Sequence, residues 1–182
     1  MAKVITTKRL ESDIDKAHNY IRTHILFPSS LLGLIAMVVG VLGLLYQLIL
    51  GTYGWETFSF SSGLLLAGVI TGWGLTKYQK FILREYPTFF SSRMKTTALR
   101  SFRKMKKSVP DVSLDHRGRG LIPFLYLFGI VMFIALSVAC IYSGALDGIP
   151  AFALPWAGFF WAKMFFWKDV IAPPGKIKKG GK

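Results

Sequence analysis

Residues 77–120 read KYQKFILREYPTFFSSRMKTTALRSFRKMKKSVPDVSLDHRGRG and lie between two hydrophobic halves of the chain. This connector carries twelve of the 23 Lys and Arg residues, and only Glu85, Asp111 and Asp115 oppose them. The flanking halves consist of long uncharged runs, so the connector marks where the chain leaves an apolar environment and enters it again. The position of these charges therefore decides the fold class.

The composition of the whole chain is that of a membrane protein. Hydrophobic residues make up 52% and charged residues 18%, against roughly 25% charged in an ordinary soluble domain. The net charge of +14 lies beside apolar runs, where anionic lipid headgroups are a nearer partner than nucleic acid. A single cysteine, Cys140, excludes an intrachain disulfide and a cysteine-based metal site.

Four apolar runs are long enough to cross the roughly 30 Å hydrocarbon core of a bilayer as helices. They cover residues 26–50, 58–76, 121–142 and 149–167. Short loops join the first run to the second and the third to the fourth. The sequence therefore predicts an all-α integral membrane protein with four transmembrane helices in two hairpins, residues 26–76 and 121–167.

The connector, residues 77–120, contains an apolar stripe at helical spacing, flanked by Lys and Arg. Its members are Phe90, Met94, Ala98, Phe102, Met105 and Val109. Such a stripe is typical of an amphipathic helix lying in the membrane interface. The sequence therefore predicts that a basic interfacial helix joins the two hairpins.

The two ends of the chain are polar. Residues 1–25 place Leu10, Ile14, Ala17 and Ile21 on one helical face, which favours an amphipathic lead over a disordered tail. This lead mixes basic and acidic groups ahead of any apolar run, so no cleaved signal peptide is expected. Residues 168–182 form a basic tail rich in Pro and Gly.

The distribution of charge also predicts an orientation. The loops 51–57 and 143–148 contain no Lys or Arg, whereas the lead, the connector and the C-terminal segment, together with Lys163 at the end of the fourth run, hold all 23. Because positively charged segments stay in the cytoplasm, we expect both termini and the connector there. The expected location is a plasma or inner membrane.

Small residues at four-residue spacing are candidates for helix packing. The second run contains the pair Gly68 and Gly72, and the first contains Ala36 and Gly40. Spacing of this kind lets two helices approach closely in lipid. The alternative is that glycine is simply common in membrane helices.

Groups for catalysis or ion coupling are absent from the predicted spans, which contain no Asp, Glu, His or Arg. Proton relays and coupled pumps use such groups, so neither an enzyme nor a pump is expected. Lys163 is the only charge in a span and lies near its end, where snorkelling explains it.

His18, His24 and His116 all fall on the expected cytoplasmic side. A shared haem or metal site would need three or four ligands, and no Cys or carboxylate cluster accompanies them. Solvated interfacial histidines are the default, so no cofactor or metal is expected in the chain itself. Whether a partner supplies one to these histidines is open.

The basic residues of the connector are the best candidates for activity. Clusters of Lys and Arg beside a span attract anionic lipid, and the Arg-Gly-Arg-Gly segment before the third run resembles a phosphate-binding helix start. The alternative is that the charge only fixes topology. The candidate headgroup contacts are Arg93, Lys95, Arg100, Arg103, Lys104, Lys106, Lys107, Arg117 and Arg119.

Two functional hypotheses follow. The first is a non-catalytic accessory subunit or organiser of a larger membrane complex, with other membrane subunits or further copies of itself as partners. The second is a small oligomeric transporter or channel for an uncharged or lipidic substrate, which predicts that Gly68→Leu or Gly72→Leu abolishes flux. Anionic membrane lipids are expected partners in both, and nucleic acid in neither.

Overall fold

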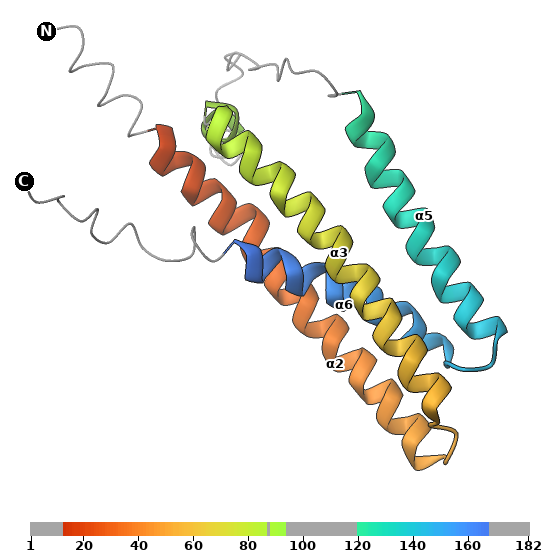
Figure 1. Cartoon of the computed structure of the whole chain (residues 1–182). Helices are drawn as coiled ribbons and strands as arrows, with labels where there is room; N and C mark the ends of the chain where they lie inside the picture. The colour runs from red at the N-terminus through yellow and green to blue at the C-terminus, as the bar shows by residue number, and fades with distance from the viewer. Residues whose placement is uncertain (1–12, 87, 94–119, 168–182) are drawn as a thin grey trace, which may run out of the picture.

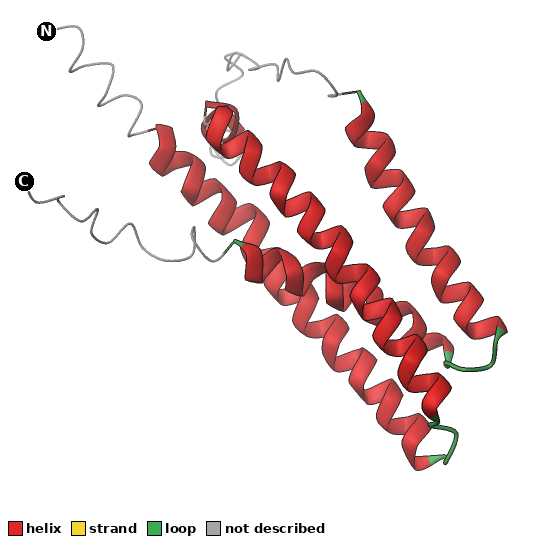
Figure 2. Cartoon of the chain, viewed as in Figure 1, coloured by secondary structure: helices red, strands yellow, loops and turns green. Residues whose placement is uncertain are grey.

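The structure is a computed structural model that describes residues 13–86, 88–93 and 120–167. Within these ranges all regular secondary structure is helical (Figure 2). Among the described residues, four helices are long and apolar enough to cross a membrane, namely Asp13–Ile49, Trp55–Glu85, Leu121–Tyr142 and Gly148–Phe166. The predicted all-α fold with four helices of this kind is therefore confirmed.

The first helix begins in the predicted polar lead and continues without a break into the first span. Its regular part is α2 (Phe27–Ile49), preceded by the π-helical turn η1 (Ile21–Leu26). Pro28 follows directly, and a proline ring clashes with the carbonyl four residues earlier, here that of His24. The wider turn, in which the Phe27 N–H bonds to the Arg22 carbonyl, relieves this clash and keeps the helix continuous.

The second helix, α3 (Trp55–Glu85), runs beyond the predicted span. Its length is about 46 Å at 1.5 Å per residue, more than the hydrocarbon core requires. It ends at Glu85, with Tyr86 as its C-cap before Pro87, and residues 88–93 are helical again. The third and fourth helices, α5 (Leu121–Tyr142) and α6 (Gly148–Phe166), match the remaining predicted spans closely.

The last helix occupies the centre of the bundle. α6 packs against α2 on one side and α3 on the other, whereas α2 and α3 are consecutive yet hardly touch (Figure 1). α5 packs lightly on α6 and makes few contacts with α3. The bundle is therefore three closely packed helices with a fourth at its edge.

Small residues make the central position of α6 possible. On α3, a Cβ added at Gly68 or Gly72 would fall against the Pro155 or the Phe159 carbonyl oxygen of α6. On α2, a Cβ at Gly40 would lie 3.1 Å from Leu154 Cδ2 and 3.7 Å from Ala153 Cβ. Side chains at Gly68 or Gly72 would force α3 and α6 apart, whereas at Gly40 the Leu154 side chain would only have to shift slightly. Such close packing holds helices together in lipid, which supplies no hydrophobic drive.

Pro155 lies inside α6 and removes the amide that would bond to the Ala151 carbonyl. The Ser137 hydroxyl of α5 lies 2.8 Å from that carbonyl oxygen and also 2.8 Å from the Phe133 carbonyl oxygen. Ser137 is almost completely buried. A hydroxyl from a neighbouring helix thus replaces the missing backbone donor, as apolar surroundings require.

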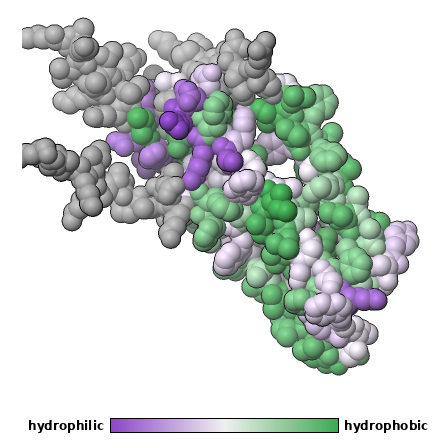
Figure 3. Space-filling model, viewed as in Figure 1, coloured by the Kyte–Doolittle hydropathy of each residue, from purple (hydrophilic) through white to green (hydrophobic). Residues whose placement is uncertain are grey.

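One end of the bundle, which we call the polar end, joins the start of the first helix, the end of α3, residues 88–93 and Trp167. Its buried core contains Ala17, Ile21, Leu26, Ile82, Phe90 and Trp167. Hydrophilic residues gather here, whereas most of the visible face beyond is hydrophobic (Figure 3). We call the opposite end, with the loops 50–54 and 143–147, the loop end.

Candidate functional site

A cavity of about 570 Å³ lies between α3, α5 and α6. It exists because α5 stands away from α3 and touches α6 over only part of its length. Its volume lies in the range of roughly 300–1,000 Å³ that small-molecule sites occupy. The lining is Thr71, Gly74, Leu75 and Tyr78 of α3, Ile122, Leu125, Tyr126, Phe128, Gly129, Ile130, Met132 and Phe133 of α5, and Trp156, Phe159 and Lys163 of α6.

Towards the loop end the cavity is aromatic. The Phe133 ring meets the Trp156 ring edge to face at 5.3 Å between centroids, and the Phe159 ring at 6.1 Å. Trp156 in turn stacks on Phe160 at 6.2 Å. Interlocked rings of this kind form a stable apolar wall, so this part of the cavity keeps its shape and accepts only apolar groups.

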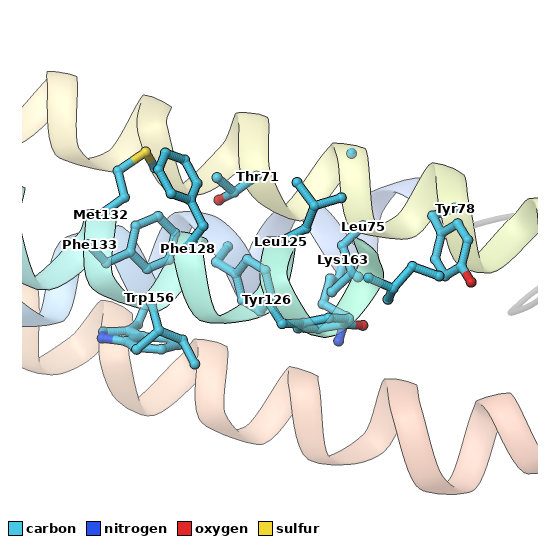
Figure 4. Close-up of a pocket in the computed structure, with 15 residues that line it drawn as sticks. Thr71, Leu75, Tyr78, Leu125, Tyr126, Phe128, Met132, Phe133, Trp156 and Lys163 are labelled. Atoms are coloured by element: carbon cyan, nitrogen blue, oxygen red, sulfur yellow. The ribbon is translucent and has the colours of Figure 1, made fainter. Parts of the chain in front are cut away.

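Towards the polar end the cavity becomes polar. Figure 4 shows Tyr78, Lys163 and the Tyr126 hydroxyl at one end and Met132, Phe133 and Trp156 at the other. The Gln79 side chain lies close to the Tyr126 hydroxyl, and its Oε1 atom is buried without a partner in the described part of the chain. The site thus changes along its length from hydrocarbon-like to hydrogen-bonding.

Lys163 is the charged group of the cavity. Its Nζ atom lies 5.4 Å from the centroid of the Phe159 ring, a cation–π contact that partly offsets the loss of water. No Asp or Glu forms an ion pair with it within residues 13–86, 88–93 and 120–167. Sequence reasoning explained Lys163 by snorkelling alone and missed its place in a cavity, because the gap between α5 and α3 leaves no mark in the sequence.

Two glycines of the lining leave room for side chains. A Cβ added at Gly74 of α3 or at Gly129 of α5 would meet no atom within 4 Å. Gly68 and Gly72 differ from Gly74, which lies on the same α3 helix, because both contact the α6 backbone. The cavity side of α3 is therefore open, while its α6 side is closed by direct helix contact.

The predicted helix-packing residues all lie on described helices. Gly40, Gly68 and Gly72 are buried and face α6, and Ala36 is half-buried on α2. Of the predicted headgroup contacts, only Arg93 is described, with its guanidinium 4.7 Å from the Phe89 ring centroid. Outside the described residues lie Lys95, Arg100, Arg103, Lys104, Lys106, Lys107, Arg117 and Arg119.

The histidines and the cysteine are placed separately. His18 is half-buried and His24 is exposed, with its ring 5.0 Å from that of Tyr20, while His116 lies outside the described residues. Cys140 is buried in α5. Among the described residues no three His, Cys, Asp or Glu side chains gather as metal ligands.

Comparison with protein-family models, curated proteins and solved structures finds no match to the chain. The geometry of the cavity is therefore the basis for a functional proposal.

Proposed function

We propose that this chain is a non-catalytic membrane protein that holds the apolar part of a lipid in the cavity between α3, α5 and α6. The observation that carries the proposal is the separation of α5 from α3, which leaves an apolar cavity inside a bundle of helices long enough to span a bilayer. Ligands of membrane bundles are commonly bound between helices. A lipid reaches such a site sideways from the bilayer, without crossing water.

The chemistry of the lining supports binding over reaction. Nucleophilic catalysis requires an activated nucleophile beside a base, and the lining offers Thr71, two tyrosines and Lys163 without a histidine or carboxylate. Thr71 donates its hydroxyl to the α3 backbone, 2.9 Å from the Gly68 carbonyl oxygen. This lining suits a bound molecule that stays chemically unchanged.

We further propose that the protein inserts as two hairpins, with the polar end, both termini and the connector in the cytoplasm. The loops 50–54 and 143–147 at the loop end contain no Lys or Arg, which supports this orientation because the positive-inside rule counts basic residues. The connector would then lie against the membrane surface through its predicted amphipathic helix and its Lys and Arg side chains.

Gly129→Leu tests the binding proposal, because Gly129 lines the cavity and a Cβ added there meets no atom within 4 Å. Gly63→Leu is the matched control, since Gly63 also has open space around it but lies outside the lining. The full-length chain is purified in mild detergent, and the lipid retained is measured by native mass spectrometry. We expect Gly129→Leu to lose retained lipid and Gly63→Leu to keep it.

Equal retention by the two variants at equal thermal stability would refute lipid binding in this cavity. The accessory-subunit hypothesis stays a prediction, and a partner protein of fixed stoichiometry in the same spectra would support it. Gly68→Leu and Gly72→Leu are unsuitable probes of a lipid path, since both would push α6 away from α3 and test packing instead.

A further inference from the structure

The lining of the cavity contains one half-buried ammonium group, that of Lys163, in the last turn of α6. Lys163 lines the apolar cavity, and no described carboxylate pairs with it. An ammonium group held away from water is costly unless an anion or a water-filled path accompanies it. The aromatic face of Phe159 offsets only part of that cost. A bound anion would supply the missing partner.

The arrangement of polar and aromatic residues in the lining determines the orientation of a bound ligand. Tyr126 and Lys163 place a hydroxyl and an ammonium group towards the polar end, whereas Phe133 and Trp156 line the other end with rings (Figure 4). Hydroxyl and ammonium groups are hydrogen-bond donors to a carboxylate or phosphate. The cavity is therefore complementary to a molecule with an anionic head and an apolar tail.

We propose that the ligand is an anionic amphiphile, whose carboxylate or phosphate group pairs with Lys163 and whose tail lies against Phe133 and Trp156. This inference rests on the proposed function and adds the charge and orientation of the bound lipid to it. A free anion would occupy only the polar end of the cavity, so the tail is needed for binding.

Binding of four probes to the full-length chain in neutral detergent tests the proposal. The probes are oleate, an oleoyl lysolipid with a phosphate monoester head, methyl oleate and inorganic phosphate, at a pH where both anionic heads are ionised. We expect the two anionic lipids to bind roughly tenfold more tightly than methyl oleate, because a close charge pair shielded from water by a bound lipid contributes about one factor of ten. Inorganic phosphate is expected to show no binding.

Three variants assign the preference to one side chain. Lys163→Gln should reduce the affinity for the anionic lipids to that for methyl oleate, and Lys163→Arg should keep the preference. Lys77→Gln is the matched control, because Lys77 lies over the Trp73 ring at 4.7 Å in the same four-residue relation to an aromatic but outside the lining. It should leave all affinities unchanged.

The outcomes separate this inference from the proposed function. If Gly129→Leu abolishes binding of every lipid but Lys163→Gln leaves the anionic preference intact, lipid binding stands and the role of Lys163 is refuted. If the unsubstituted chain does not distinguish oleate from methyl oleate, the inference is likewise refuted. If Gly129→Leu binds all lipids normally, both proposals are refuted. Tight binding of inorganic phosphate would identify an anion site without a lipid.

Discussion

Ser137 shows how a single hydroxyl supports a proline-containing helix in apolar surroundings. Its oxygen is 2.8 Å from the Ala151 carbonyl oxygen, which has lost its amide partner to Pro155. The same hydroxyl is equally close to the Phe133 carbonyl oxygen on its own helix, and that carbonyl has a helical amide as a second donor. The hydrogen bond to the Ala151 carbonyl of α6 is therefore the one that no backbone amide can replace.

Ser137→Ala should therefore destabilise the bundle by about 1 kcal/mol, the size of interhelical hydrogen bonds in membranes. In a Pro155→Ala background the cost should fall to near zero, because the alanine amide now bonds to the Ala151 carbonyl. The free energy of unfolding of the four chains in mixed micelles measures this coupling. The same cost of Ser137→Ala in both backgrounds would show that the bond to Ala151 does not stabilise the protein.

At this scale the sequence predicts some residue roles and not others. Gly68 and Gly72 stand out in the sequence because a small residue every fourth position is a helix-packing pattern. Ser137 and Lys163 do not stand out, since a serine and a terminal lysine in a span are usual. Their roles depend on which carbonyl or cavity lies opposite, and that is set by the neighbouring helices.

Among the elements, α6 is the one that holds the bundle together, because both α2 and α3 pack on it. Hydropathy locates the spans well, since length and apolarity are properties of each run alone. Hydropathy does not reveal which helices pack against each other. A second signal lies in the small residues of α6, where Ala151, Gly158 and Ala162 are buried.

The central position of α6 predicts a specific cross-link. The Cβ position of Gly40 lies 3.7 Å from Ala153 Cβ, within the roughly 3.5–4.5 Å of disulfides. In a Cys140→Ser background, Gly40→Cys with Ala153→Cys should form a disulfide on mild oxidation. The α2–α3 pair Gly40→Cys with Gly63→Cys should not, and its mobility on non-reducing gels is the control. The reverse pattern would mean that α2 and α3 pack directly.

The whole molecule divides into a polar end with its own small core and a loop end without described basic residues. If the proposed orientation is correct, a cysteine at Thr52 reacts with a membrane-impermeant maleimide in intact cells, in the Cys140→Ser background. A cysteine at Lys16 reacts only after permeabilisation. Labelling of Lys16→Cys but not of Thr52→Cys in intact cells would show the opposite orientation and contradict the positive-inside rule for this chain.

The position of α6 also sets an order for biosynthesis. α6 is the last of the four helices to leave the ribosome, yet it provides the surface on which α2 and α3 pack. Until it enters the membrane, the glycine faces of the two earlier helices have only lipid beside them. A nascent chain that stops before Gly148 therefore presents loosely associated helices to membrane quality control, and proteolysis of such fragments should be far faster than that of the finished chain.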